Sequence, residues 1–342
     1  MRPGVRILIA GLGAIGQRHA RNLRALRGGE LELFAYRSRR LRHVVTDALT
    51  KDATRDVEVE LGVRSFDDLD DALGARPDAV FICTPSSRHL DVAQRAADAG
   101  CHLFIEKPVS NTMAGVERLR ATVAAKRLVA MVGSQWRFHP CVRALRAAIQ
   151  GGTLGRLSSA EINYAEYLPD WHPYEDYRTS YAARAELGGG VVLTQIHDYD
   201  LASWLFGAPH RVTATGGTLG GLEIDVEDTV DARLEGGRVP VRVRQTFAAR
   251  PPMRTIAVTG ERCSATLDML GARLSFVPPL APEMSVAEYQ RNTMFVDEVA
   301  KFLESVERRG PPAVTLDDGI TALRVALAVK ESMQTQRTVD IR

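Results

Sequence analysis

The sequence predicts an α/β protein of two domains, an N-terminal doubly wound parallel sheet of the Rossmann type and a C-terminal α/β domain with an open sheet. The length of 342 residues exceeds what one hydrophobic core usually supports. Up to about residue 133 apolar strands alternate with amphipathic helices, whereas from about residue 155 the apolar residues alternate with a period of two. We therefore expect domains at 1–133 and 134–342.

The first domain has the strand–helix rhythm of a parallel sheet that is covered on both faces. Its predicted strands cover 5–10, 31–36, 79–83, 102–105 and 128–132, and its predicted helices cover 17–26, 40–50, 67–73, 87–98 and 112–125.

The second domain is predicted to hold a largely antiparallel mixed sheet, because its short apolar runs are separated by Gly, Pro or charged residues. Two helices, near 290–308 and 316–334, follow the sheet and are separated by Gly310, Pro311 and Pro312. An open sheet with few covering helices tends to bury its free face against another subunit. We expect a homo-oligomer, a dimer or tetramer, that forms through this sheet.

Composition excludes several classes of partner and cofactor. A formal net charge of +2 gives no reason to expect nucleic acid or an anionic membrane. No segment approaches the ~18 apolar residues of a membrane span, and the N-terminus lacks the features of a signal peptide. The four cysteines are scattered without metal-ligand spacing, which indicates free thiols in a reducing compartment. We expect a cytoplasmic protein without a metal.

A glycine motif, GLGAIG, directly follows the first predicted strand and precedes a helix. In this context Gly11 permits the tight turn, Gly13 lets the backbone approach a pyrophosphate, and Gly16 lets helix and strand pack closely. The helix N-terminus offers free N–H groups and a partial positive charge to an anion. The motif predicts a dinucleotide site, and a Gly-rich turn without a ligand is the alternative.

The end of the second strand indicates which dinucleotide is preferred. An Asp or Glu about 20 residues past the glycines bonds the ribose hydroxyls in NAD-specific folds. Here that place holds Tyr36, followed by Arg37, Ser38, Arg39 and Arg40. Guanidinium groups and a hydroxyl suit a 2′-phosphate, so NADP(H) is expected over NAD(H). A solvated basic turn is the other interpretation.

Two polar segments lie at the carboxyl ends of predicted strands, where the crevice of such a sheet opens. CTPSSRH ends at His89, in the first turn of a helix, and EKP places Lys107 after the apolar run LFI. We expect Lys107 to reach the crevice, with Pro108 holding the turn, if necessary through a cis bond. A Glu–Lys surface pair at a strand end is the alternative.

A third segment, GGGVVLTQIHDYDLASWLFG, combines three glycines with a predicted helix. On that helix Thr194, His197 and Asp198 fall close together at i, i+3, i+4 spacing. A histidine in an apolar stripe can equally be a core residue, but the glycines and polar neighbours favour a site.

Together these segments resemble the Gfo/Idh/MocA family, named for glucose–fructose oxidoreductase and inositol dehydrogenase. GLGAIG, CTP with its His, EKP, WRFHP at 136–140 and GGG…H…D…WLFG occur in the family's order over about two hundred residues. The resemblance implies a Rossmann domain plus an α/β domain with an open mixed sheet, and an NAD(P)-dependent oxidoreductase of sugars or cyclitols. It implies that Lys107 and His197 match the catalytic lysine and histidine, and that Arg137 and Phe138 lie near the crevice.

One departure leaves the chemistry open. Many family members carry Asp four residues after GGG, with the histidine four residues beyond it; here Thr194 takes that place and His197 follows after three residues. Lys107 is expected to stabilise the substrate oxygen and His197 to act as general acid/base. Burial can also let a lysine take the proton, so the two roles can be exchanged.

The expected activity is hydride transfer between a secondary alcohol or ketone of a sugar, a keto-sugar (free or nucleotide-linked) or a cyclitol and the nicotinamide. Two alternatives stand beside it: a glycoside-cleaving enzyme that oxidises C3 transiently and retains NAD, and a non-catalytic redox-sensing binder. The lysine of EKP counts against the last.

A tyrosine-rich stretch between residues 164 and 181 is the expected contact for a polyhydroxylated ring, with Arg178 for an acidic substituent. An aromatic anchor at a domain or subunit contact is equally open. The expected cofactor site comprises Gly11, Gly13, Ala14, Ile15, Gly16, Tyr36, Arg37, Ser38, Arg39, Thr84, Pro85, His89, Glu106, Lys107, Pro108 and Arg137. The expected substrate site comprises Lys107, Arg137, Trp171, Tyr177, Arg178, Tyr181, Thr194, His197 and Asp198.

Overall fold

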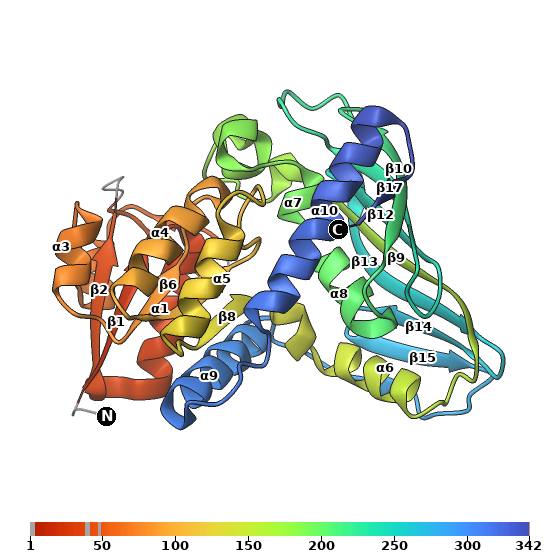
Figure 1. The fold of residues 1–342 in the computed structure, drawn as a ribbon, viewed down its shortest axis with the longest axis horizontal. Helices are drawn as coiled ribbons and strands as arrows, with labels where there is room; N and C mark the ends of the chain where they lie inside the picture. Colours follow the sequence, from red (N-terminus) through yellow and green to blue (C-terminus); the bar gives the residue numbers. More distant parts are fainter. Residues whose placement is uncertain (1–3, 38–41, 47–48, 342) are drawn as a thin grey trace. The chain divides into compact units, whose positions relative to one another are not determined.

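The computed structural model describes residues 4–37, 42–46 and 49–341, which form two compact units (Figure 1). The first unit comprises residues 1–133, 172–175 and 292–319, and the second comprises 134–171, 176–291 and 320–342. The sequence predicted domains at 1–133 and 134–342. Segments 172–175 and 292–319 belong to the first unit.

The first unit contains a six-stranded parallel sheet in the order β5-β2-β1-β6-β7-β8. The order reverses between β1 and β6, which makes this the switch point of a doubly wound fold. The strands are β1 (Val5–Ala10), β2 (Leu31–Tyr36), β5 (Val63–Phe66), β6 (Ala79–Ile82), β7 (His102–Glu106) and β8 (Ala130–Gly133). The helices are α1 (Ala14–Arg27), α2 (Val57–Leu61), α3 (Leu69–Gly74), α4 (Ser86–Asp98), α5 (Val116–Ala125) and α9 (Asn292–Arg308).

The predicted helix 40–50 is wrong. Its described residues contain β3 (Val44–Val45), which pairs with β4 (Lys51–Asp52), just past the segment, in a short hairpin. The β-branched valines favour the extended conformation, and the hydroxyls of Thr46 and Thr50 contact each other at 2.7 Å across the turn. The pattern also missed α2 and β5, which are only five and four residues long.

Helix α9 returns to the first unit because its apolar face completes that unit's core. It packs against α1, and the Phe302 ring contacts Phe81 and Phe104 at centroid distances of 5.3 and 5.6 Å. All three side chains are fully buried. The sequence order alone did not reveal this long-range contact.

The second unit contains a nine-stranded sheet in the order β16-β15-β14-β13-β9-β12-β11-β10-β17. Neighbouring strands are antiparallel except β9 and β12, which are parallel. The strands are β9 (Leu157–Tyr167), β10 (Arg211–Gly217), β11 (Thr229–Glu235), β12 (Val241–Thr246), β13 (Ala248–Gly260), β14 (Ser264–Asp268), β15 (Arg273–Val277), β16 (Met284–Ser285) and β17 (Val339–Asp340). The predicted mixed, largely antiparallel sheet is confirmed.

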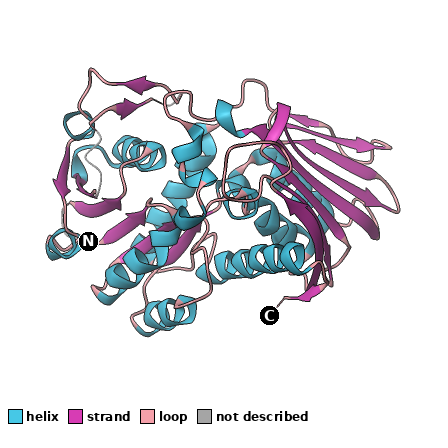
Figure 2. Cartoon of the chain, turned by 90° about the horizontal axis from the view of Figure 1, so that it is seen from above, coloured by secondary structure: helices cyan, strands magenta, loops and turns pink. Residues whose placement is uncertain are grey.

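Helices lie along one face of this sheet, and none of the residues that the structure describes form a layer over the other face (Figure 2). They are α6 (Pro140–Gln150), α7 (Val191–Thr194), α8 (His197–Phe206) and the part of α10 (Leu316–Thr335) that belongs to this unit. On the uncovered face, Arg244 pairs with Glu161 and Arg242 pairs with Asp231 across neighbouring strands. No helix of the described residues has the length and apolar character needed to cross a membrane.

Candidate functional site

The glycine motif forms a tight loop at the switch point of the parallel sheet. Gly11 has a φ of +101°, and a Cβ there would come within 2.6 Å of the Cys83 carbonyl oxygen. A Cβ on Gly16 would come within 2.0 Å of the Gly11 carbonyl oxygen, so both positions exclude a side chain. Gly13 differs, because a Cβ there would meet nothing within 4 Å.

The open space at Gly13 lies at the N-terminus of α1, which Ala14, Ile15 and Gly16 begin. No side chain caps this terminus, so its N–H groups are available to an anion. The nearby Thr84 hydroxyl is buried and has no hydrogen-bond partner among the described residues. These features fit the pyrophosphate of a dinucleotide.

Residues at the end of β2 give a different result from the sequence prediction. The Arg37 side chain is buried and its guanidinium pairs with Glu58 of α2, so in this structure it faces the protein and not a 2′-phosphate. The Tyr36 carbonyl accepts a hydrogen bond from Gly11 N at 3.0 Å. Ser38, Arg39 and Arg40 lie outside the described residues.

Gln17 is a residue of this region that sequence reasoning missed. Its buried side-chain amide donates to the Leu12 and His43 carbonyls and accepts from Val45 N. It thereby ties the glycine loop to the β3–β4 hairpin. The sequence signal that could have identified Gln17 was a polar residue directly after Gly16, on the buried side of α1.

His89 holds the two crevice loops together. Its ring nitrogens lie 2.6 Å from the Pro108 carbonyl oxygen and 2.7 Å from the Thr84 carbonyl oxygen. Burial lowers the pKa of His89, whereas the hydrogen bonds to the Pro108 and Thr84 carbonyls, which both require an N–H on the ring, raise it and offset part of that effect. With both nitrogens engaged, His89 positions the Thr84–Pro85 turn and the Lys107–Pro108 turn and leaves no ring atom for the direct cofactor contact that we expected.

Lys107 follows the last residue of β7, at the same edge of the sheet as the glycine loop. The Lys107–Pro108 peptide bond is cis, as anticipated for this turn. Glu106, the preceding residue, is buried and contacts His19 of α1 at 2.7 Å. Sequence reasoning placed Glu106 in the cofactor site but did not find its partner, although His19 follows the last motif glycine by three residues.

In the second unit, Arg137 forms a buried ion pair that sequence reasoning did not anticipate. Arg137 Nε and Nη2 donate to the two carboxylate oxygens of Asp200, at 2.9 and 2.5 Å. The guanidinium also lies over the Trp204 ring, 5.2 Å from its centroid. This fork joins the WRF segment to α8, so the structure supports a positioning role more than the expected ligand contacts.

Asp198 is likewise turned into the protein. Its two oxygens accept from Gln245 at 2.8 Å and from Arg254 at 3.3 Å, and its exposed fraction is 0%. The Arg254 guanidinium is itself enclosed by the Trp136 and Tyr164 rings. Asp198 therefore anchors α8 to β12 and β13, and is not at a surface that a substrate reaches in this structure.

His197 begins α8 and is almost fully buried. Its Nε2 lies 3.4 Å from Gln135 Nε2, next to the WRF segment. The predicted single helix is interrupted at Gln195 and Ile196, so Thr194 ends α7 and His197 starts a new helix. His197 belongs to the second unit and Lys107 to the first.

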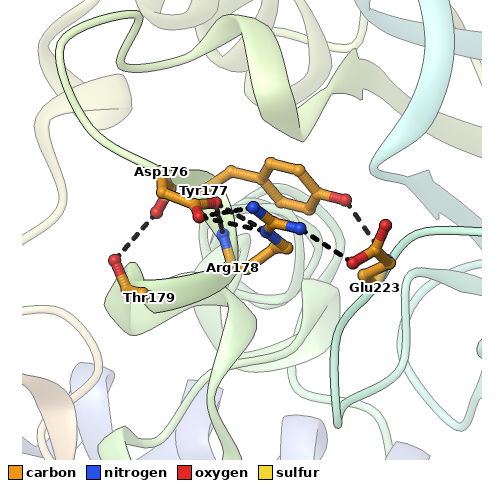
Figure 3. Close-up of polar contacts among 5 residues, drawn as sticks. All are labelled: Asp176, Tyr177, Arg178, Thr179 and Glu223. Carbon is orange, nitrogen blue, oxygen red and sulfur yellow. Dashed lines mark hydrogen bonds and ion pairs between the residues drawn. The ribbon is translucent and has the colours of Figure 1, made fainter.

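The tyrosine-rich stretch folds into a loop of short 3-10 turns, with Tyr181 starting the turn Tyr181–Ala183. Figure 3 shows that Arg178 is held between Asp176 and Glu223, with Nη2–Oδ2 and Nη1–Oε2 distances of 2.8 and 2.9 Å. The Tyr177 hydroxyl accepts from Glu223 N at 3.3 Å. Trp171 packs edge-on against Phe247. Two carboxylates thus already neutralise the arginine that we expected to bind an acidic substituent.

Comparison with known families identifies this combination of units. Residues 5–134 match the model of an oxidoreductase family with an NAD-binding Rossmann fold, and residues 142–266 match the GFO/IDH/MocA C-terminal domain. The chain belongs to the Gfo/Idh/MocA family. The resemblance inferred from the motifs is confirmed, and with it the assignment as an NAD(P)-dependent oxidoreductase.

Individual members of the Gfo/Idh/MocA family are similar over most of the chain. Myo-inositol 2-dehydrogenase of Thermotoga maritima is 26% identical, with 98% of both chains covered. Scyllo-inositol 2-dehydrogenase (NAD(+)) of Bacillus subtilis is 30% identical over 64% of this chain and 58% of its own. The crystal structure of myo-inositol 2-dehydrogenase from Lactobacillus plantarum superimposes with a TM-score of 0.79 at 23% identity, covering 99% of this chain and 100% of that one.

Proposed function

We propose that this protein transfers hydride between a secondary alcohol or ketone of a sugar or cyclitol and a nicotinamide coenzyme, with Lys107 and His197 as its catalytic residues. The observation that carries the proposal is Lys107 just past the carboxyl end of β7, at the same edge of the sheet as the glycine loop whose Gly13 and α1 N-terminus are open to a dinucleotide. Three relatives are named as inositol dehydrogenases, and inositol is a polyhydroxylated ring, so these names support a polyhydroxylated substrate.

In the proposed reaction, the carbinol carbon loses a hydride and its hydroxyl loses a proton, which leaves a ketone. Bound nicotinamide supplies the hydride acceptor, or the hydride donor in the reverse direction. The Lys107 ammonium donates a hydrogen bond to the substrate oxygen as charge develops there. His197 exchanges the proton, since an imidazole titrates near neutral pH.

The proposed coenzyme is NADP(H), with NAD(H) as the alternative. At the end of the second strand, where NAD-specific folds carry Asp or Glu, this chain has Tyr36 and Arg37, and Arg39 and Arg40 follow in the sequence. The Arg37–Glu58 pair weakens the support from Arg37, and the relative named for NAD(+) supports the alternative. We expect Arg39→Asp to lower the kcat/KM ratio for NADPH over NADH at least about tenfold, whereas Arg118→Asp on α5 leaves the ratio unchanged. A wild-type ratio that favours NADH would refute the preference.

The substrate site is proposed to include Trp171, Tyr177 and Tyr181, whose aromatic faces and hydroxyls suit a sugar-like ring, and the buried Thr194. Because Arg178 is paired with two carboxylates, the favoured substrate is a neutral polyol or keto-sugar. The decisive assay uses cyclitols, aldoses and nucleotide-linked keto-sugars with both coenzymes, followed through the absorbance of the reduced nicotinamide. Absence of turnover across the panel, with coenzyme bound, would reject the proposed function.

The proposed assembly is a homo-oligomer formed through the uncovered face of the nine-stranded sheet. That face carries polar and small side chains such as Thr255, Ala257 and Thr266, which allow another layer to approach. Buried free thiols at all four cysteines fit a reducing compartment, the cytoplasm. Light scattering at micromolar concentration tests the assembly, and a monomer would exclude it.

A further inference from the structure

A buried histidine–carboxylate pair lies directly beneath the Lys107 turn. His19, on α1, is completely enclosed, and its ring lies 5.4 Å from the Phe81 centroid and 5.0 Å from the Phe104 centroid. Its Nε2 is 2.7 Å from Glu106 Oε1. Because His19 Nδ1 has no acceptor among the described residues, Nε2 carries the hydrogen and donates it to Glu106.

Glu106 keeps its negative charge in this apolar setting. Burial by itself raises the pKa of Glu106, but the hydrogen bond from His19 and the electrostatic effects of His19 and Lys107 outweigh it, and the pKa lies below its usual range. The other titratable groups that face this carboxylate are His89 on α4 and the Cys83 thiol at the end of β6. Burial and the Glu106 charge raise the pKa of Cys83, so the thiol stays neutral and Glu106 is the anion of the group.

The neighbouring strand makes room for this carboxylate. Glu106 pairs with Gly133 in the β7–β8 ladder. A Cβ on Gly133 would lie 3.3 Å from the carboxyl carbon and from both oxygens, closer than ordinary van der Waals contact. A side chain at 133 would therefore press on the carboxylate.

We propose that Glu106, fixed by His19 and accommodated by Gly133, is a positioning residue that holds the neighbouring Lys107 in its ammonium form. The coupling between the two charges is reciprocal: if the lysine charge favours the Glu106 carboxylate, the carboxylate favours the lysine charge by the same free energy. Lys107 then donates to the substrate oxygen and does not accept the hydroxyl proton. This inference rests on the proposed function. It assigns the proton transfer to His197 and excludes Lys107 as the group that takes the proton.

The charge of Lys107 can be measured without turnover, because the chain has only five lysines. Carbon-13 labelling of the lysine ε-carbons gives five signals, which NMR can follow against pH in the coenzyme-free protein. We expect the Lys107 signal to titrate at lower pH in Glu106→Gln than in the wild type, by about one unit or more. Glu32→Gln, an exposed change on β2, should leave it unchanged.

Two further variants keep the test decisive if Glu106→Gln does not fold. His19→Gln retains an N–H donor and should preserve the Lys107 titration, whereas Gly133→Ala displaces the carboxylate and should lower it. In the wild type, kcat/KM should fall at high pH with the pKa of the Lys107 titration. In Glu106→Gln, this fall in kcat/KM should shift to lower pH together with the titration. Coenzyme affinity, measured by fluorescence, should change less than about threefold.

Two results would overturn the inference. One is a wild-type Lys107 that is already neutral near pH 8, and the other is a Lys107 titration that Glu106→Gln and Gly133→Ala leave in place. A pair that serves the fold alone would lower the melting temperature without moving the titration. Loss of the proposed function would appear separately, as a protein that shows the predicted titration and turns over no substrate in the panel.

Discussion

At the scale of single residues, several side chains predicted for the ligand site hold other residues in place in this structure. His89 connects two carbonyls of the crevice loops, Arg137 forks onto Asp200, and Asp198 is enclosed by Gln245 and Arg254. A sequence motif places such residues near a site. It does not show whether a residue contacts the ligand itself or supports another residue that does. The burial of each side chain and the hydrogen-bond partners of its polar atoms distinguish these two roles.

Lys107 is the residue whose replacement tests the proposed chemistry most directly. Lys107→Ala should lower kcat at least about a hundredfold, since the substrate oxygen loses its charged donor. Coenzyme affinity should be retained, because the glycine loop and α1 are untouched. Lys301→Ala, on the exposed side of α9, is the matched control and should keep wild-type kcat. Turnover near the wild-type rate in Lys107→Ala would contradict the assignment.

His139 should make stability dependent on pH. Burial against Trp136 and Tyr289 lowers the pKa of His139 from 6.5 to about 4. Between these values the unfolded chain binds a proton that the folded protein does not, so stability falls as pH drops from about 6.5 toward 4.

The expected loss over that range is about 2–3 kcal/mol. Urea unfolding at several pH values measures it, and His139→Gln should flatten this part of the curve. An equal pH slope in wild type and variant would show that another group is responsible.

At the scale of elements, long periodic segments were predictable and short ones were not. Every strand of the parallel sheet except β5, and helices α1, α4, α9 and α10, were found within a few residues of their limits, because apolar runs mark the buried strands and burial on one face leaves a clear period in the helices. The β3–β4 hairpin, α2 and β5 are too short to show a clear apolar pattern. The break between α7 and α8 also escaped prediction, since Gln195 and Ile196 are compatible with a helix locally and only the tertiary contacts of Gln195 separate the two.

The glycine loop gives a prediction in which two similar substitutions have different effects. Gly13→Ala should fold with stability within about 1 kcal/mol of the wild type, because its Cβ enters open space. It should weaken coenzyme binding at least about tenfold, since that space is where the pyrophosphate approaches.

Gly16→Ala should instead destabilise the fold by about 1–3 kcal/mol, because its Cβ would collide with the Gly11 carbonyl oxygen. Thermal unfolding and calorimetric titration with coenzyme, applied to both variants, distinguish the two effects. Equal losses of stability in the two variants would contradict this account of the loop.

At the scale of the whole molecule, the family, the fold and the main motifs were accessible from the sequence, because local glycine and strand signals occur in a fixed order. The composition of the first unit was not accessible, because α9 is separated from its partners Phe81 and Phe104 by about two hundred residues. The pairs Glu106–His19 and Arg137–Asp200 were missed for the same reason.

The discontinuous first unit predicts that a fragment of residues 1–133 is unstable. Without α9, the fragment exposes the apolar surface that Phe302 covers, and it should aggregate or melt well below the intact protein. Joining residues 292–319 to it through a flexible linker should restore a cooperative transition.

In the full chain, Phe302→Ala should cost about 3–5 kcal/mol, and Lys301→Ala on the same helix should cost little. Circular dichroism during heating measures all four proteins. A stable, cooperative 1–133 fragment would show that α9 is dispensable.

The late position of α9 also matters during synthesis. The nucleotide-binding sheet emerges from the ribosome first, yet α9 is translated only after every strand of the second sheet except the short β17 has been made. At cellular elongation rates this leaves the surface around Phe81 and Phe104 uncovered for roughly ten seconds or more. During that interval the nascent chain offers an apolar patch to chaperones, and this protein's yield in a cell should depend on them more than its final stability suggests.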